Sequence, residues 1–433
     1  MKKRILLSLA ALLLCVTLLS SCNLYPDGGL NNSGNKTNND ITDSPSLIGT
    51  LIEQYSYYNY ELTEDELSRA VVAAYKELTG DLYARYYTAA EYEELNRENV
   101  GNNQGVGITI TENTEYNCIE IISVLPNTPA MEAGLLPGDL IVQVGIGEKA
   151  EKVSDIGYEI ALTKMRGESG TTLEIGVVRN GEFENIIEFS IVRAPFTSES
   201  VTYAVSAADS SVGIVKILNF DLTTPTQFKA AMEDLISKKC TSFVYDVRNN
   251  PGGDLASISA VLAFFLNEGD TIIITEDRSG KTETDICEPV RYSGDYSSCN
   301  IVKEEIGKYR SYPSAVLING NTASAAELFT GTLKAYGLST IVGETSYGKG
   351  CMQSIIPLSN YGSKYTGALK LTTKYYRPYN MTNYHGIGIT PSEGYEVILS
   401  EEAASINHYK LLEAENQKLD NQLSAAISAI KNK

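Results

Sequence analysis

The chain has 433 residues, of which 43% are apolar and 21% are charged, a composition typical of a globular protein. Its 54 acidic and 35 basic residues give a net charge of −19, which argues against a protein that binds nucleic-acid phosphates. Two histidines are too few for a His-rich metal site, and they favour a catalytic base other than His. At about 150 residues per domain, the length predicts roughly three domains.

Residues 1–21 have the pattern of a secretory signal. A basic start (residues 2–4) precedes an uncharged, Leu-rich run at residues 5–19, which is shorter than the ~20 residues of a spanning helix. The run ends in Leu-Ser-Ser-Cys at Cys22, which resembles the bacterial lipobox and implies that Cys22 carries a lipid. Residues 22–46 are rich in Asn, Gly and Ser and predict a flexible tether spanning roughly 25–30 Å. We therefore expect an extracytoplasmic lipoprotein anchored to the cell membrane, with an ordinary secretory signal as the alternative.

The cysteines after the predicted signal do not follow the pattern of a disulfide-rich or metal-binding protein. Their odd number and irregular spacing fit neither a set of disulfides nor a zinc site, so we expect no metal and no cofactor. Cys287 and Cys299 are near enough in sequence to pair, and the sequence leaves that pairing open.

Residues 47–100 are predicted to form a helical N-terminal region. Apolar residues recur at helical spacing from Glu64 to Leu78. A Tyr-rich turn, Gly80–Thr88, follows.

Short strands separated by glycines are predicted from Gly101 onward. The strings Pro-Ala, Ala-Gly-Leu and Gly-Asp-Leu-Ile follow one another between residues 129 and 141, and the run resembles a PDZ domain over residues 101–194. A Gly-flanked turn leaves N–H groups free to hold a terminal carboxylate, and the following strand offers an edge to a peptide. The resemblance implies a peptide site at Gly105, Val106, Gly107 and Ile108; a small β-rich domain that binds nothing is the alternative. Arg166, at the end of a PDZ helix, is a candidate link between PDZ occupancy and activity.

Strands and helices alternate over residues 195–400, which predicts an α/β domain. Residues 401–433 contain neither Gly nor Pro, and their spaced apolar residues predict a long helix or a helix pair. This segment packs either on its own domain or against a second copy of the chain.

Three strings in the α/β region carry the candidate chemistry: Asp246–Gly253, Asn319–Glu327 and Gly343–Gln353. A serine in the first turn of a helix exposes its hydroxyl beside unpaired N–H groups, but it needs a base. Neither histidine lies nearby in sequence, whereas burial of Lys349 would lower the pKa of its amine and let it act as that base. Ser324 alone is equally typical of an N-cap, and Lys349 alone of a surface lysine. Their joint occurrence favours catalysis.

In this order the three strings resemble the C-terminal processing peptidases, also called tail-specific peptidases. The resemblance runs from the N-terminal helices, where Gly80–Thr88 matches a family segment, to the C-terminal helix. It implies an α/β crotonase/ClpP-like serine peptidase domain with an inserted PDZ domain and helical N- and C-terminal segments. It also implies that Ser324 is the nucleophile, Lys349 the base and Gln353 the amide that orients the base. Lys349, Cys351 and Gln353 alternate along a predicted strand, so they are expected on one face.

The predicted oxyanion hole needs two N–H donors. Ala325 supplies one, and either Gly252 or Gly253 supplies the other, because glycine allows backbone to approach a ligand closely. Asp246 and Arg248 are expected to position this turn through hydrogen bonds, and Cys351 is expected to line the site.

The chain departs from the family pattern at two places. Ser392 stands where the family usually has Asp, which puts a local contact in doubt, and Asn321-Thr322 stand where Gly-Ser is more usual.

The sequence therefore predicts a lipid-anchored serine endopeptidase that cleaves exported proteins near their C-termini. The PDZ domain would capture an apolar C-terminal tail, and the terminal helices are candidates for contact with a second copy. Two alternatives remain: a PDZ adaptor on an inactive peptidase-like domain, and a crotonase-like enzyme acting on acyl thioesters, which the export signal disfavours.

Overall fold

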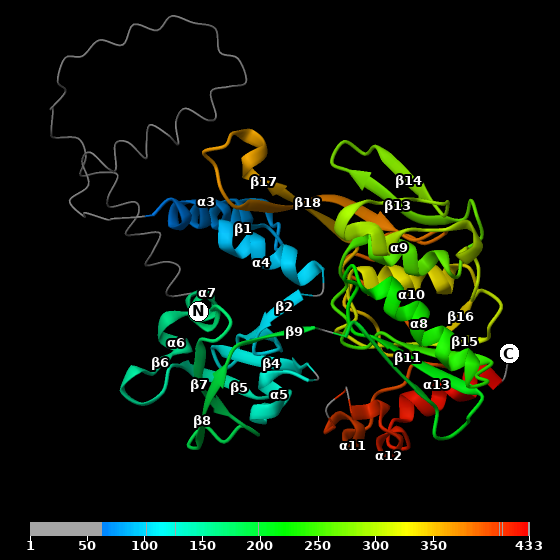
Figure 1. The fold of residues 1–433 in the computed structure, drawn as a ribbon, viewed down its shortest axis with the longest axis horizontal. Coiled ribbons are helices and arrows are strands. Elements are labelled where there is room, and N and C mark those ends of the chain that lie inside the picture. Colours follow the sequence, from blue (N-terminus) through cyan, green and yellow to red (C-terminus); the bar gives the residue numbers. More distant parts are fainter. Residues whose placement is uncertain are drawn as a thin grey trace, which may run out of the picture. The chain divides into compact units, whose positions relative to one another are not determined.

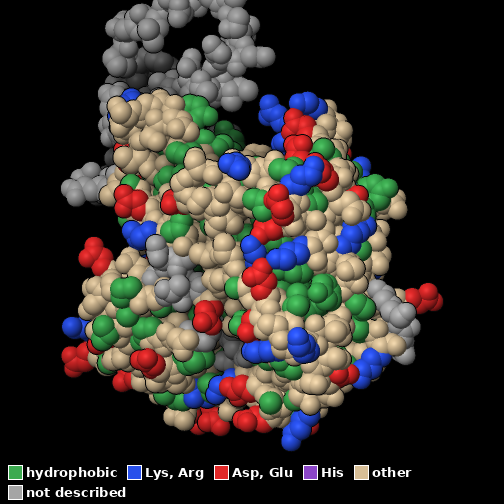
Figure 2. Space-filling view, turned by 45° about the vertical axis from the view of Figure 1, so that its right-hand side comes forward, with side chains coloured by type: hydrophobic (Ala, Val, Ile, Leu, Met, Phe, Trp, Pro, Cys, Tyr) green, Lys and Arg blue, Asp and Glu red, His purple; other side chains and the backbone are tan. Residues whose placement is uncertain are grey.

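The computed structural model describes residues 63–431, with the exception of residues 101, 126, 198, 407 and 409 (Figure 1). The predicted signal, the predicted lipid attachment at Cys22 and the predicted tether lie outside the described residues. Within the described residues, no helix is long and apolar enough to cross a membrane. Figure 2 shows acidic and basic side chains interspersed on the face that it presents.

The first described elements are two helices with a short strand between them: α3 (Glu64–Thr79), β1 (Arg85–Tyr87) and α4 (Ala89–Asn99). A reciprocal capping box starts α4. The Thr88 N–H donates to Glu91 at 2.9 Å, and the Glu91 N–H donates to Thr88 Oγ1 at 3.2 Å. Glu91 is therefore fixed at the start of α4, where it also receives ion pairs.

A β-rich unit follows, with its own apolar core around Ile119, Ile121, Ile141 and Ile175. Its main sheet has the order β3-β4-β5-β7-β8, with β6 paired to β5, and β2 pairs with β9 as a separate ribbon. Its strands are β2 (Asn102–Gly105), β3 (Ile108–Asn113), β4 (Cys118–Val124), β5 (Leu140–Val144), β6 (Glu151–Lys152), β7 (Thr172–Val178), β8 (Ile186–Val192) and β9 (Ala194–Thr197). Its helices are α5 (Pro129–Ala133), η1 (Gly147–Lys149), α6 (Val153–Ile156) and α7 (Tyr158–Met165).

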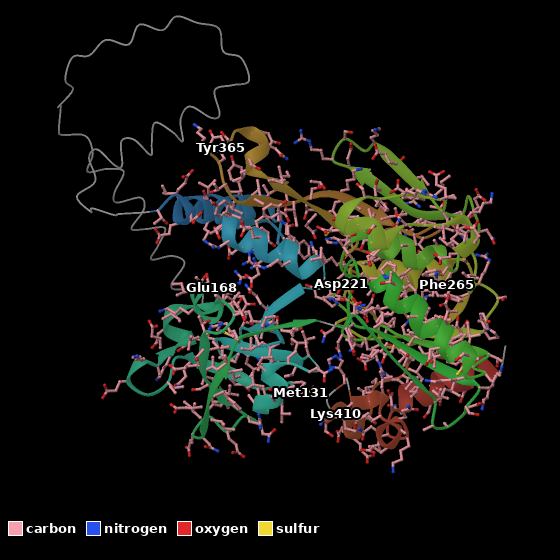
Figure 3. The ribbon with its side chains drawn as sticks, in the orientation of Figure 1. Met131, Glu168, Asp221, Phe265, Tyr365 and Lys410 are labelled. Atoms are coloured by element: carbon pink, nitrogen blue, oxygen red, sulfur yellow. The ribbon has the colours of Figure 1, made fainter. Side chains whose placement is uncertain are left out.

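The α/β unit is built on a sheet of the order β10-β11-β12-β15-β16, in which only β10 is antiparallel to its neighbour. These strands are β10 (Val201–Val205), β11 (Val212–Ile217), β12 (Ser242–Asp246), β15 (Ser314–Ile318) and β16 (Ser339–Gly343). One face packs against α8 (Thr224–Ser237), α9 (Leu255–Ala263) and α10 (Ala325–Ala335), and the other against α13 (Asn421–Lys431) (Figure 1). Because both faces are covered, the central strands β11, β12, β15 and β16 are buried along their whole length and mostly apolar, with Lys216 and Asp246 as a buried charged pair. Phe265, labelled in Figure 3, lies in the core on the α8–α10 side.

A second sheet contributes residues to the core on the α8–α10 side and carries part of the site. It has the order β1-β18-β13-β14, with β17 also paired to β18. Its further strands are β13 (Thr271–Asp277), β14 (Thr282–Ile286), β17 (Cys351–Pro357) and β18 (Ala368–Arg377), and short 3₁₀ turns lie at η2 (Gly294–Cys299), η3 (Lys303–Glu305) and η4 (Leu358–Tyr361). The N-terminal region therefore contributes a strand, β1, to the sheet that holds β17 and β18.

The C-terminal segment is not the long helix or helix pair that its composition predicts. It forms α11 (Glu401–Ala404), η5 (Lys410–Leu412), α12 (Ala414–Gln417) and then α13. Buried Asp420 sets the start of α13, because its carboxylate accepts the Leu423 N–H at 2.9 Å. The apolar side of α13 then packs on the chain's own sheet.

The five cysteines of the described chain are free, buried thiols. Cys287 and Cys299 are therefore unpaired, which answers the question that their spacing left open. Burial is the main cause that raises the pKa of each of these two thiols to about 11.

Candidate active site

Ser324 lies at the sharp connection between β15 and α10. Its φ of 57° is rare for a residue other than glycine and marks a strained backbone. The connection is tied down by Thr322, whose hydroxyl donates to the Val247 carbonyl at 2.9 Å and accepts the Asn319 N–H at 3.0 Å. The departure from the family pattern at Thr322 thus keeps a working hydroxyl. The other departure, at Ser392, also keeps a side-chain hydrogen bond, since Ser392 Oγ accepts the Ile341 N–H at 3.0 Å.

Ser324 opens onto a cavity of about 560 Å³. Its apolar part is lined by Phe220, Ile258, Ile273 and Leu328, and its polar part includes Lys349, Cys351, Gln353 and Lys370. Asp221, labelled in Figure 3, also lines it and keeps a buried carboxylate oxygen without a hydrogen-bond partner among the described residues. The cavity can hold an apolar side chain beside a reactive serine.

A buried carboxylate, Glu327, joins the backbone of Ser324 to that of Lys349. One oxygen accepts the Ser324 N–H at 2.9 Å and the Lys349 N–H at 2.7 Å. The other accepts the Ser346 hydroxyl at 2.6 Å and the Gly348 N–H at 2.7 Å. The Glu327 N–H itself donates to the Ser324 carbonyl, and Ser324 and Glu327 form a capping box at the start of α10. Ser324 is therefore the N-cap of α10, as the competing interpretation of this residue predicts, and it also lines the cavity.

Lys349 precedes β17 and projects its amine into the cavity wall. Burial is the main cause that lowers the pKa of Lys349, and the nearby Cys351 and Glu327 oppose that shift. Its Nζ lies over the Tyr83 ring, 4.5 Å from the ring centroid. No hydrogen bond joins Lys349 Nζ to Ser324 Oγ in this part of the structure. The amine is desolvated, as a lysine base requires, and is held by an aromatic face.

Gln353 lies in the same cavity but does not make the predicted contact with Lys349. Its amide nitrogen donates to Thr372 Oγ1 at 3.2 Å and to Cys351 Sγ at 3.3 Å, and no hydrogen bond to Lys349 occurs among the described residues. The prediction assumed regular alternation along one strand. Instead, Lys349 lies before β17, and a register shift at Met352/Gln353 interrupts the strand.

The structure distinguishes the two glycines considered for the oxyanion hole. The Gly252 N–H already donates to Asn250 Oδ1 at 2.8 Å. The N–H groups of Gly253 and Ala325 have no partner among the described residues. A Cβ at Gly252 would lie 2.7 Å from Ser324 Cβ, so glycine is required here for the turn to approach Ser324 this closely.

Asp246 and Arg248 form a buried ionic cluster beneath this turn, not hydrogen bonds to the turn itself. The Arg248 guanidinium contacts Asp246 at 2.8 Å and Asp420 at 2.7 Å, and Lys216 Nζ contacts Asp246 at 2.9 Å. The charges of these four residues sum to zero, which offsets the cost of burying each of them. The cluster joins β11 and β12 to the start of α13. The pKa of His408 is lowered to about 3, mainly by burial and also by the positive charges of this cluster.

The predicted peptide site lies at the start of β3, whose outer edge is open because β3 pairs only with β4. Gly105 and Gly107 have φ values of 142° and 83°. The carbonyl of Val106 accepts the Ala130 N–H at 2.8 Å, which fixes the turn before Ile108. The Val106 and Gly107 N–H groups have no backbone partner in the described chain, so they are free to bind a carboxylate.

Arg166, at the end of α7, contacts the N-terminal region. Its guanidinium pairs with Glu91 of α4 and lies 3.9 Å from Glu94. Glu91 also pairs with Arg69 at 2.8 Å and with Arg85 of β1 at 3.5 Å. Arg166 was singled out only from its turn; it shares the partner Glu91 with Arg85, which lies on a strand paired to β18.

Sequence reasoning missed Lys370 and Tyr376, which line the cavity, and Asp81, which holds Thr372 beside it. Asp81 accepts both the N–H and the hydroxyl of Thr372, and the Tyr376 hydroxyl donates to the Lys349 carbonyl at 3.0 Å. The family-like segment Gly80–Thr88 was the available signal for Asp81 and Tyr83. Nothing in the local pattern around Lys370 pointed to the cavity.

A strained serine at a helix start, a desolvated lysine and two free N–H groups beside one cavity define a serine peptidase. Residues 211–394 match the family model described as peptidase family S41, and residues 94–177 match that of the PDZ domain. A carboxy-terminal-processing protease of Bartonella bacilliformis is 31% identical over 339 residues, covering 75% of this chain and 71% of the relative. The chain belongs to peptidase family S41 and is a serine-type C-terminal processing peptidase with a PDZ domain.

Two further likenesses agree with this assignment. The carboxy-terminal processing protease CtpB of Bacillus subtilis is 28% identical over 336 residues, covering 77% of this chain and 64% of that protein. The solved photosystem II D1 C-terminal processing protease has a TM-score of 0.54 and 23% identity, covering 81% of this chain and 86% of that structure. At this identity the structural likeness establishes the fold alone.

Proposed function

We propose that the chain is an extracytoplasmic, lipid-anchored endopeptidase that uses Ser324 and Lys349 to cleave exported proteins near their C-termini. The observation that carries the proposal is the shared carboxylate of Glu327, which holds the backbones of both residues beside one cavity. The pattern of residues 1–46 supports export, with lipid attachment at Cys22. The parallel sheet flanked by helices supports the crotonase/ClpP-like relation of the peptidase domain.

In the proposed reaction, neutral Lys349 takes the proton of the Ser324 hydroxyl, and Ser324 Oγ attacks the scissile carbonyl carbon. The N–H groups of Ala325 and Gly253 bind the oxyanion that forms. Lys349 then gives its proton to the leaving amine, and the peptide bond breaks to leave an acyl-enzyme. Water attacks the ester with Lys349 again as base, which releases the acid and restores Ser324.

In this mechanism Gln353 acts through its neighbours and not by direct contact with the amine. It holds Thr372 and Cys351, and Asp81 holds Thr372 from the other side. Together they fix the wall against which the Lys349 side chain rests.

The PDZ domain, residues 101–194, is proposed to recruit the apolar tail of the substrate at the open edge of β3. The peptidase domain then spans residues 195–400, with residues 47–100 and 401–433 as its helical flanks. Arg166 is proposed to couple PDZ occupancy to the site, because its partner Glu91 also holds Arg85. Loss of tail-stimulated turnover in Arg166→Ala, with tail binding retained, is the expected result. Unchanged stimulation would remove Arg166 from the mechanism.

The test is cleavage of an unstructured protein with an apolar C-terminal tail by the full chain. We expect Ser324→Ala and Lys349→Ala to abolish cleavage while folding and tail binding persist, and Lys364→Ala, at an exposed lysine, to cleave normally. Cleavage by the Ser324→Ala or Lys349→Ala chain would refute the assignment. Tail binding without cleavage by the unsubstituted chain would instead favour a PDZ adaptor.

A further inference from the structure

A second lysine lies in the cavity of Ser324 and Lys349 and has no part in the reaction described above. Lys370 is on β18, opposite Ile355 of β17 and Arg85 of β1. It lines the same cavity as Lys349. Within residues 63–431 its amine forms no ion pair and no hydrogen bond. A partly buried cation without a partner is unfavourable, so its presence in this cavity calls for a function.

We propose that Lys370 is a positioning residue that keeps the Lys349 amine in its neutral form by placing a positive charge in the same cavity. The inference rests on the proposed Ser–Lys mechanism, in which only the neutral amine of Lys349 can take the serine proton. Repulsion between two ammonium groups acts on both of them. A charge on Lys370 therefore favours loss of the proton from Lys349.

The other groups around Lys349 show why such a charge is useful. Glu327 of α10, the Cys351 thiol of β17 and the Tyr83 ring all favour the protonated amine. Only burial opposes them among the causes that act on Lys349 directly. A nearby cation adds to burial and offsets the carboxylate of Glu327.

The groups around Lys370 leave its charge free to act on Lys349. Burial is the main cause that lowers the pKa of Lys370 to about 8, followed by the charges of Lys349 and Arg85. Asp81 and the Cys351 thiol oppose them, and the Asp81 carboxylate also accepts two hydrogen bonds from Thr372. Lys370 and Lys349 are thus coupled amines, and the productive state has the proton on Lys370.

The experiment is the pH profile of kcat/KM for a peptide substrate with no acidic residue, measured on the full chain. Lys370→Met removes the charge and keeps the length, and we expect the acid limb of the profile to move up by about one pH unit. One unit below the wild-type limb, kcat/KM then falls about tenfold. Lys370→Glu should move the limb further in the same direction.

Lys370→Arg provides the opposite test, because arginine keeps its charge at every working pH. Its acid limb is expected at or below that of the wild type. Lys374→Met is the matched control: Lys374 lies on the same strand but pairs with Glu283 outside the cavity, and its profile should match the wild type. If Lys370 had only a structural role, the pH of the acid limb would not follow the charge at position 370 from one variant to the next.

Several results would overturn the inference. Limbs that coincide for Arg, Lys and Met at position 370 would show that this charge does not act on the base. A loss confined to substrates with carboxylates would assign Lys370 to substrate binding instead. If Lys370→Met does not fold, Lys349 can be titrated through its ¹³Cε signal in two folded variants, Ser324→Ala and Ser324→Ala/Lys370→Arg. The pKa of Lys349 must not be higher in the variant that carries Lys370→Arg. Cleavage by Lys349→Ala would overturn the proposed function itself, whereas an inactive Lys349→Ala with coincident limbs overturns only the role of Lys370.

Discussion

Replacing Glu327 by Gln tests the link between Ser324 and Lys349, the proposed nucleophile and base. The two side chains have nearly the same shape, but the amide nitrogen of Gln must face two of the four donors that the carboxylate now accepts. Ser346 can turn its hydroxyl and adapt, so the least costly orientation places the nitrogen toward Ser346 and Gly348. The Gly348 N–H then loses its partner in a buried site.

The magnitude follows from these bonds. An unsatisfied buried donor costs about 1–3 kcal/mol, and each remaining bond weakens when its acceptor loses its charge. We expect Glu327→Gln to lower the free energy of unfolding by about 3 kcal/mol. A shift of the nucleophile by as little as about 1 Å can lower kcat/KM about 100-fold. Urea unfolding and peptide cleavage measure the two effects, with Glu393→Gln, at an exposed glutamate, as control.

The same variant has a signature in pH. The Glu327 carboxylate raises the pKa of Lys349, so its removal must move the acid limb of the kcat/KM profile to lower pH. Stability within about 1 kcal/mol of the wild type, together with kcat/KM within about threefold, would refute the structural role. A limb that moves to higher pH would refute the electrostatic one.

Three other predictions concern the surroundings of the site. Gly252→Ala should abolish cleavage without affecting tail binding, because the new Cβ would lie 2.7 Å from Ser324 Cβ. Gly320→Ala is the control and should remain active, because a Cβ at Gly320 meets open space. An active Gly252→Ala enzyme would contradict the close approach. Asp420→Asn should lower the free energy of unfolding by about 3 kcal/mol, since it leaves the Arg248 side of the cluster undercompensated, and a loss in urea unfolding below about 1 kcal/mol would contradict this. His408 has its pKa lowered to about 3 in the folded chain, so the unfolded chain takes up the proton first and stability should fall below about pH 6.5 by at most ~1.4 kcal/mol per pH unit. His408→Gln should reduce that slope between pH 6 and pH 4, and an unchanged slope would exclude His408 as its source.

The sequence was sufficient where a local pattern has a single structural meaning. The buried strands at 212–218 and 242–247 could be predicted because residues covered on both faces form mostly apolar runs. Ser324 could be placed at a helix start because small residues and a capping-box Glu follow a strand. In each case, the residues that decide the structure lie within a few positions of one another.

Contacts that depend on register or on distant strands could not be predicted. The alternation that would place Gln353 against Lys349 fails at a register shift that no residue type at 352 or 353 announces. Lys370 reaches the cavity only because β18 pairs with both β1 and β17. Lys216 was a usable signal, since a lysine in an otherwise apolar buried strand requires a partner. Its partners could not be identified from the sequence, because Asp246 lies on the next strand and Asp420 far along the chain.

The protonation state of Lys349 is set by opposing effects, of which burial is the largest. A fully exposed lysine keeps its proton at neutral pH, and one buried without partners has a depressed basicity and is a poor proton acceptor. Glu327 and the Tyr83 ring favour the ammonium, whereas burial and, as proposed, Lys370 favour the amine. Glu327 and Lys370 act in opposite directions, so neutralising both in one chain should return the acid limb toward its wild-type position. A double variant whose limb lies beyond that of either single variant would show that at least one of the two charges does not act on Lys349.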